Sequence, residues 1–294
     1  MKKIILLLMI VNVMAFGRET PKVRIGMVLS NLENPFFKEM EDGALERARR
    51  DNVSVEVVSA EDSPVRELQE IRRFIDEKVD VLIVNPTNSH AVSRGVILAN
   101  EAGIPVITLD REAVRGDVAS HIGSNNLLGG NLAAGYLKEN LDRGAKIVEL
   151  QGNTETTASL NRSRGFEQGS LGELRIILRE NADFKREHSY EIMKRVLREE
   201  IDVDGVFAHN DESALGALRA VEESGRDVVV VGFDGTDEAE EAIIQGRLDA
   251  TVKQNPYEMG YMGVESAIKL TKKQWVNRKI DVGVYLIDKK TLTK

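Results

Sequence analysis

The chain has 294 residues, enough for two ordinary domains, and its 42% hydrophobic and 30% charged residues are normal for a soluble globular protein. The net charge of −8 argues against nucleic acid or an anionic membrane as partner, because binders of phosphate groups usually present a net basic face. The absence of cysteine excludes disulfides and leaves no thiol for a lipid anchor.

The first residues are typical of a secretory signal peptide. Lys2 and Lys3 give a positive start, and an eight-residue apolar run follows over residues 4–11. This run is too short to span a membrane. A small-residue cleavage motif ends at Ala15, and cleavage after Gly17 is the alternative. The other interpretation, a buried strand at the start of the fold, fits the lysine pair less well.

We therefore expect a signal peptide over residues 1–17. An exported protein without an anchor needs an enclosed compartment to stay near its cell. The expected location is the periplasm of a bacterium with an outer membrane.

Short runs rich in Val and Ile alternate with helical patterns along the rest of the chain. Because these runs contain few polar residues, they are typical of strands buried on both faces of a parallel sheet. The predicted strands are Val23–Leu29, Val53–Val58, Val81–Val84, Val106–Leu109, Ile147–Leu150, Leu174–Leu178, Gly205–Phe207, Val228–Gly232 and Ala250–Lys253.

The segments between the strands have helical spacing. Ser63 followed by Pro64 is typical of a helix start, and the apolar residues from 65 to 75 then form one stripe. Residues 125–141 and 212–221 behave similarly. Alternating strands and helices imply parallel sheets covered by helices on both faces. So many units predict two lobes, and the lack of a Pro/Gly/Ser-rich linker favours several short crossings between them.

Polar side chains recur at or just past the carboxyl ends of these strands. In open parallel sheets, ligands bind in the crevice outside those ends, so two facing sheets would direct the polar residues into one cleft. Amide and carboxylate groups match the donors and acceptors of sugar hydroxyls. The residues concerned are Asn34, Asn85, Asp110, Asn210, Asp234 and Gln254.

Several of these residues also fit a purely structural role when taken alone. Asn34 and Asn210 each precede a predicted helix and are good N-caps. Asp110 and Asn85 are residue types that favour turns. Their recurrence at equivalent positions in both halves favours a ligand site.

Two arginines and a pair of aromatic residues add to the pattern. Arg111 and Arg162 offer fixed donor forks, and we expect Asp110 to pair with Arg111 and Asp234 with Arg162. Adjacent aromatic rings at positions 36 and 37 lie in a strand-to-helix loop and could cover the apolar face of a sugar, although core packing is the alternative.

A family resemblance appears at these residues. The segments that carry it are Asn34-Pro35-Phe36-Phe37, Val84-Asn85-Pro86-Thr87, residues 104–111, Glu149-Leu150-Gln151-Gly152, residues 207–212, residues 214–220 and residues 231–236. In them the chain resembles the type I periplasmic binding proteins of sugar ABC transporters, and most of all the members that bind D-ribose. The likeness covers nearly the whole chain after the signal peptide.

This resemblance implies a set of ligand-binding residues. In the first lobe, Asn34, Asn85, Asp110 and Arg111 would hydrogen-bond the sugar. In the second lobe or at its hinge boundary, Arg162, Asn210, Asp234 and Gln254 would do the same. Phe36 and Phe37 would cover one side of the ring and Phe184 the other, with Phe233 as a neighbouring aromatic.

The resemblance also implies the domain organisation and the partners. Three hinge crossings are expected near Ser124, Gln254 and Asp281, with residues 18–124 and 255–281 in the first lobe and residues 125–254 and 282–294 in the second. The implied partners are D-ribose and the permease of an ABC importer, with a chemotaxis receptor left open as another, and the implied state is a monomer. Allose and autoinducer-2 stay open as alternative ligands.

Three features depart from the family pattern without touching the expected hydrogen-bonding positions. Glu33 lies just before Asn34 and the pair of aromatic residues at 36 and 37. Asn153-Thr154-Glu155 replaces a loop of small residues. The third departure is His209, next to Asn210.

Two other classes of function fit less well. The segment around Asp234 resembles the nucleophile loop of aspartate-based phosphatases, but Gly232 stands where the nucleophilic carboxylate is needed. Nucleotide-binding motifs are absent, and the four histidines lack metal-ligand spacing, so we expect no enzyme, cofactor or metal. A repressor of the LacI type would need an N-terminal helix-turn-helix, and the signal peptide leads directly into Val23–Leu29.

Overall fold

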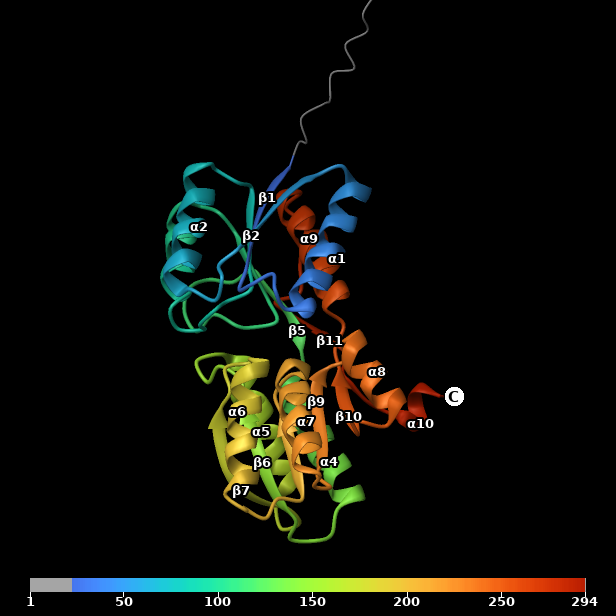
Figure 1. The fold of residues 1–294 in the computed structure, drawn as a ribbon. Helices are drawn as coiled ribbons and strands as arrows, with labels where there is room; N and C mark the ends of the chain where they lie inside the picture. Colours follow the sequence, from blue (N-terminus) through green and yellow to red (C-terminus); the bar gives the residue numbers. More distant parts are fainter. Residues whose placement is uncertain (1–22, 294) are drawn as a thin grey trace, which may run out of the picture.

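The computed structural model describes residues 23–293, so the expected signal peptide lies outside the described residues. These residues form two lobes, each built on one six-stranded sheet (Figure 1). The strands of the first sheet are β1 (Arg24–Leu29), β2 (Ser54–Ser59), β3 (Val81–Val84), β4 (Val106–Leu109), β5 (Ser120–Ser124) and β11 (Lys279–Val282). Its helices are α1 (Pro35–Asp51), α2 (Pro64–Asp76), α3 (Ser93–Glu101) and α9 (Pro256–Thr271).

The second lobe repeats this plan. Its strands are β6 (Lys146–Gln151), β7 (Arg175–Asn181), β8 (Gly205–Ala208), β9 (Val229–Asp234), β10 (Ala250–Lys253) and β12 (Tyr285–Asp288). Its helices are α4 (Asn126–Asn140), α5 (Thr157–Ser170), α6 (Arg186–Arg198), α7 (Asp211–Ser224), α8 (Asp237–Gln245) and α10 (Lys289–Leu292).

The two sheets have equivalent strand orders, β11-β5-β4-β3-β1-β2 and β12-β10-β9-β8-β6-β7. Neighbouring strands are parallel except for β12, which runs antiparallel to β10. The order reverses at β1 in one sheet and at β6 in the other, and such switch points are where open α/β sheets bind ligands.

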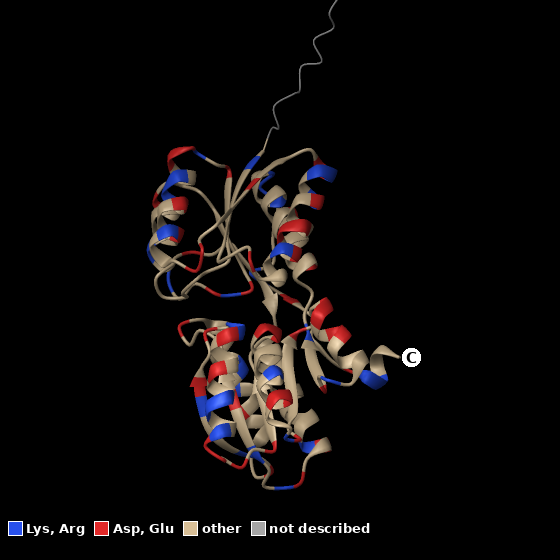
Figure 2. Cartoon of the chain, viewed as in Figure 1, with Lys and Arg blue, Asp and Glu red and all other residues tan. Residues whose placement is uncertain are grey.

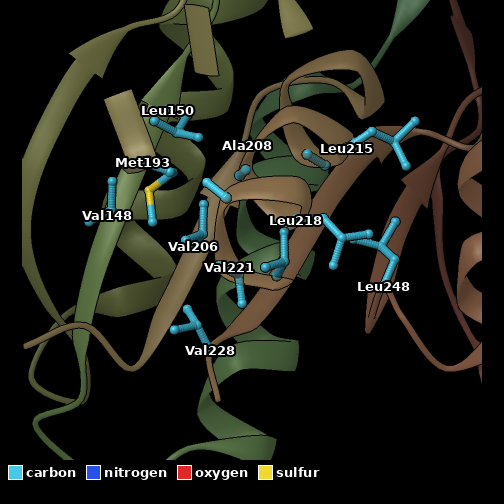
Figure 3. Packing of buried hydrophobic residues seen from close by; sticks show 14 of the residues in the cluster. Val148, Leu150, Met193, Val206, Ala208, Leu215, Leu218, Val221, Val228 and Leu248 are labelled. Atoms are coloured by element: carbon cyan, nitrogen blue, oxygen red, sulfur yellow. The ribbon is translucent and has the colours of Figure 1, made fainter. Parts of the chain in front are cut away.

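Helices cover both faces of the sheets, which is why the strands are apolar throughout. In the first lobe, Met27 and Leu29 of β1 pack with α1 and α9, whereas Val28 packs on the opposite face with Phe74 of α2. In the second lobe, one core lies between β6, β8 and helices α6 and α7, where Met193 and Leu218 meet the sheet (Figure 3). This burial on both faces fits strands rich in Val and Ile.

The predicted helix starts are confirmed to within one residue, and α7 begins at Asp211 where residue 212 was expected. Ser63 accepts a hydrogen bond from the backbone of Arg66, and Pro64 is the first residue of α2. The helix predicted from residue 125 begins at Asn126, because Asn125 is its N-cap.

The strands β5, β11 and β12 were not predicted from the sequence. The segment Ser120–Ser124 contains a single Ile, and the edge strand β11 alternates charged and apolar residues, so neither has the continuous apolar run by which buried strands are recognised. The edge strand β12 does contain a short apolar run, Tyr285–Ile287, but it is partly exposed. Four strands are longer than predicted. β6 covers Lys146–Gln151, and β8 ends at Ala208. β7 extends to Asn181 and β9 extends to Asp234, which makes Asp234 the last residue of its strand.

The chain passes between the sheets at three places, from β5 into α4, from β10 into α9 and from β11 into β12. Figure 1 shows β5 and β11 where the two lobes meet. Acidic and basic side chains are interspersed over both lobes (Figure 2), so this view shows no uniformly basic face. No helix within residues 23–293 is long and apolar enough to cross a membrane.

Candidate functional site

A cavity of about 560 Å³ lies between the lobes and is lined by residues of both. Its size falls within the range of about 300–1,000 Å³ typical of small-molecule sites. Nine of the twelve residues expected to bind ligand line it, and they are Asn34, Phe36, Phe37, Asp110, Arg111, Arg162, Phe184, Asn210 and Asp234. The other three, Asn85, Phe233 and Gln254, are buried directly behind lining residues.

In the first lobe, Asp110 is held by the residues around it. Its Oδ2 accepts a 3.1 Å hydrogen bond from the fully buried amide of Asn85, which also donates to the backbone of Leu109. The Nε of Arg111 lies 3.5 Å from the same carboxylate oxygen, as expected, and its Nη1 donates to the carbonyl of Pro86. Asp110 adopts a φ of 58°, a left-handed conformation that Asp tolerates better than most residues.

The second lobe has an equivalent arrangement. Oδ1 of Asp234 accepts a 2.7 Å hydrogen bond from Gln254 and lies 3.8 Å from Nη1 of Arg162, which is the expected pairing. Nε of Arg162 donates to Asn126 at 2.8 Å, and its guanidinium carbon lies 3.7 Å from the ring centroid of Phe233. Each lobe therefore presents one Asp and one Arg to the cavity, with a buried amide behind the Asp.

Burial dominates the electrostatics of the second pair. It raises the pKa of Asp234 well above its usual range, although the nearby Arg162 and the hydrogen bond from Gln254 oppose this shift. Burial also lowers the pKa of Arg162, opposed chiefly by Asp234. Hydrogen-bond donors from a ligand would favour the ionised carboxylate.

Asn34 and Asn210 do act as helix N-caps. Asn34 Oδ1 accepts from the backbone of Phe36, and Asn210 Oδ1 accepts from that of Ser213. Because each cap uses only the amide oxygen, the amide nitrogen remains a potential donor. That of Asn210 reaches the carbonyl of Phe184 at 3.2 Å.

The aromatic residues differ in how much they belong to the core. Phe36 and Phe37 are buried in the first-lobe core, meet edge to face at 5.3 Å and also line the cavity. Phe184 comes from a loop of the second lobe, is half-buried and lies 5.2 Å from the guanidinium of Arg111 in the first lobe. Phe233 is fully buried in the second-lobe core.

Several buried polar atoms of these residues have no hydrogen-bond partner among the described residues. They are Oδ1 of Asp110, Nε of Arg111 and Oε1 of Gln254. An unsatisfied buried polar group costs about 1–3 kcal/mol, so a ligand rich in hydroxyls that reached these atoms would recover part of that cost.

Direct hydrogen bonds also join the two lobes beside the cavity. The carbonyl of Glu155 in the second lobe accepts from the backbone of Ser89 at 3.0 Å, and its carboxylate accepts from Asn88. Thr157 donates from its backbone to Ser89 Oγ, and its hydroxyl accepts from the backbone of Glu112. The loop that departs from the family pattern therefore contacts the opposite lobe.

Several other residues that line the cavity, and one residue behind it, were not predicted from the sequence. Among these lining residues are Asn31, Glu33, Asp62, Lys185, Arg186 and Glu212. Most of them are neighbours in sequence of predicted site residues, a signal that could have identified them. Asn126, which holds Arg162, carried no such signal because it follows a strand that was not predicted.

No group of His, Cys, Asp and Glu side chains within residues 23–293 could hold a metal ion. The site therefore offers hydrogen bonds, two acid–arginine pairs and aromatic faces. Such groups can bind a small polyhydroxylated molecule, with specificity set by the geometry of the donors and acceptors.

Substituting Gly152 with alanine should disturb Phe184 and weaken ligand binding. A Cβ at residue 152 would lie 2.0 Å from the Phe184 ring, so the ring would have to leave its place beside the cavity. We expect the affinity for the sugar to fall roughly tenfold, since the loss of an aromatic contact costs about 0.5–1.5 kcal/mol beyond the area that it buries. Titration calorimetry measures this change. Gly135→Ala is the matched control, because a Cβ there meets open space, and equal affinities of the two variants would contradict this role for Phe184.

Comparison with known proteins agrees with this geometry. A family model described as a periplasmic binding protein domain matches residues 25–274. The ribose import binding protein of Salmonella typhimurium is 42% identical over 270 residues, which is 91% of each chain. That of Bacillus subtilis is 38% identical over 243 residues, covering 83% of this chain and 80% of the relative.

A solved structure supports the same grouping. An ABC transporter solute-binding protein from Bacillus halodurans with bound myo-inositol superimposes with a TM-score of 0.87 at 28% identity, covering 94% of this chain and 98% of that one. The chain therefore belongs to the periplasmic binding protein family. The predicted fold, two α/β lobes with parallel sheets flanked by helices, is confirmed.

Proposed function

We propose that this protein captures D-ribose between its two lobes in the periplasm and delivers it to the permease of an ABC importer. The observation that carries the proposal is the pair of Asp–Arg sets, one from each lobe, that face a single cavity. The relatives that are 42% and 38% identical over most of the chain are named as ribose import binding proteins. Allose and autoinducer-2 are the alternative ligands that an experiment must exclude.

The proposed ligand residues are the twelve expected from the sequence, in two roles. The nine that line the cavity would contact the sugar, and Asn85, Phe233 and Gln254 would hold the contacting side chains in place. With no catalytic role assigned to any of them, we propose binding without turnover. Because the cavity is built from one chain, a monomer suffices.

The proposed hinge lies at the three crossings near Ser124, Gln254 and Asp281, between a lobe of residues 18–124 and 255–281 and a lobe of residues 125–254 and 282–294. Neither lobe alone can surround a sugar. Ribose would therefore bind preferentially when the lobes are together and shift the population toward that state. A permease could then distinguish loaded from empty protein by shape. A chemotaxis receptor is a second partner that could recognise the same difference. The proposal also includes export, with residues 1–17 removed.

Small-angle X-ray scattering should detect this closure. We expect saturating ribose to lower the radius of gyration. The contact between Arg111 and the Phe184 ring, 5.2 Å apart, joins the two lobes in the structure, and ribose would favour this state over one with the lobes apart. Periplasmic binding proteins are established examples of hinge closure around ligands. An unchanged radius, with binding demonstrated on the same sample, would show that the lobes do not respond to the sugar.

A further inference from the structure

We propose that His209 and Glu149, which do not line the cavity, are positioning residues that hold Arg162 in place for sugar binding. This inference rests on the proposed function and adds to it a specific pair of residues behind the site. His209 is also one of the three departures from the family pattern, and the cavity itself gives it no role.

Besides the ion pair with Asp234 and the Phe184 ring 5.9 Å away, three contacts hold the Arg162 side chain, and one of them comes from His209. The Nη1 of Arg162 donates to the main-chain carbonyl of His209 at the carboxyl end of β8. The other two contacts are the hydrogen bond to Asn126 and the stacking on Phe233. A shift of the β8 end would therefore move an acceptor on which the guanidinium depends.

The His209 ring fixes that end of β8 against α5, the helix that carries Arg162. The ring is fully buried, with Nδ1 3.1 Å from Oγ of Ser159 and Nε2 3.0 Å from Oε1 of Glu149. The same carboxylate oxygen accepts from Ser163 at 2.5 Å. Ser159, Arg162 and Ser163 are three and four residues apart, so they lie on one face of α5.

Both carboxylate oxygens of Glu149 accept hydrogen bonds in this network. Burial alone would raise the pKa of this carboxyl, but the hydrogen bonds from His209, Ser163 and Arg179 together lower it below its usual value. The ionised carboxylate can only accept, so Nε2 of His209 carries the proton between them. Because a buried polar network is costly when one member is missing, removal of the imidazole should disturb β6, β8 and α5 together.

A double-mutant cycle on the full mature protein tests this inference. His209→Leu removes both ring hydrogen bonds and should weaken ribose binding roughly tenfold, within the coupling range of contacting residues. In an Arg162→Ala background, the same substitution should change the affinity less than about twofold, because the residue through which it acts is gone. His209→Gln supplies one donor and one acceptor and should restore affinity to within about threefold of wild type.

Two further variants separate positioning from general stability. Ser159→Ala combined with Ser163→Ala removes the bonds from α5 and should show the same dependence on Arg162, even if His209→Leu folds poorly. Val221→Ala truncates a buried side chain in the core of the same lobe (Figure 3), and it should lower the melting temperature without changing the affinity.

The inference is overturned if the effects of His209→Leu, or of the serine pair, on affinity are equal with and without Arg162. It is also overturned if these variants lower the melting temperature but leave the affinity unchanged, as Val221→Ala should. Failure of the proposed function would give a different result, because the wild-type protein itself would then show no ribose binding.

Discussion

Asp110→Ala is expected to weaken ribose binding by about 2–4 kcal/mol, which is a loss of roughly 30- to 1,000-fold in affinity. Truncation removes a charged acceptor whose Oδ1 is buried and has no partner among the described residues. It also leaves the amide of Asn85 and the guanidinium of Arg111 without their shared carboxylate. Titration calorimetry gives the change directly.

Asp117→Ala is the matched control for this substitution. Asp117 belongs to the same lobe, is exposed and pairs with Arg278 away from the cavity, so its loss should leave the affinity unchanged. Asp110 would be a turn former and not a sugar contact if its variant bound ribose as tightly as this control.

Asp234→Ala should have an effect of the same size, about 2–4 kcal/mol, through the other lobe. Arg162 would lose its only carboxylate within 4 Å among the described residues, and the Gln254 amide would lose an acceptor. The pH dependence of the affinity distinguishes this variant from Asp110→Ala. Because burial raises the pKa of Asp234 and sugar hydroxyls would favour its ionised form, wild-type affinity should fall as the pH drops through that raised pKa.

The Asp234→Ala variant should lack this part of the pH dependence. Asp202→Ala, an exposed residue of the same lobe paired with Lys146, should keep both the affinity and its pH profile. Calorimetry over a series of pH values compares the three proteins. A pH profile that is identical in wild type and in Asp234→Ala would mean that this carboxylate does not titrate in contact with the sugar.

The fold could be predicted largely from buried strands. Strands such as Val81–Val84 and Val106–Leu109 are apolar throughout because helices cover both faces of the sheets, and their limits match the structure. Of the strands that were not predicted, β11 and β12 are partly exposed, whereas β5 is largely buried but contains only one large apolar residue. β11 and β12 lie at sheet edges, and β5 leads directly into a crossing between lobes, so the local sequence there is mixed.

Much of the lining of the candidate site could be predicted for a related reason, because a parallel sheet brings its strand ends together. Asp110, Asn210 and Asp234 follow or end three strands, and the structure places all three at one cavity. Sequence position alone does not separate side chains that face the cavity from those one layer behind. Asn85 and Gln254 follow strands in the same way, yet each lies behind an aspartate and bonds to it.

Contacts between segments that are distant in the chain could not be predicted from the sequence. Nothing local indicates that Asn126 bonds to Arg162, or that Glu155 crosses to Ser89 in the other lobe. Such pairs depend on how α4 and α5 pack and on how the lobes meet. The same holds for His209, which the sequence marked as unusual without indicating its partner Glu149.

Titration calorimetry of the wild-type protein with D-ribose, D-allose and autoinducer-2 tests the central claim most directly. Ribose should bind at one site per chain and more tightly than the other two ligands, because a site of buried donors and acceptors rejects a ligand that leaves them unpaired. No heat of binding with ribose, beside saturable binding of allose or autoinducer-2, would contradict the proposed function.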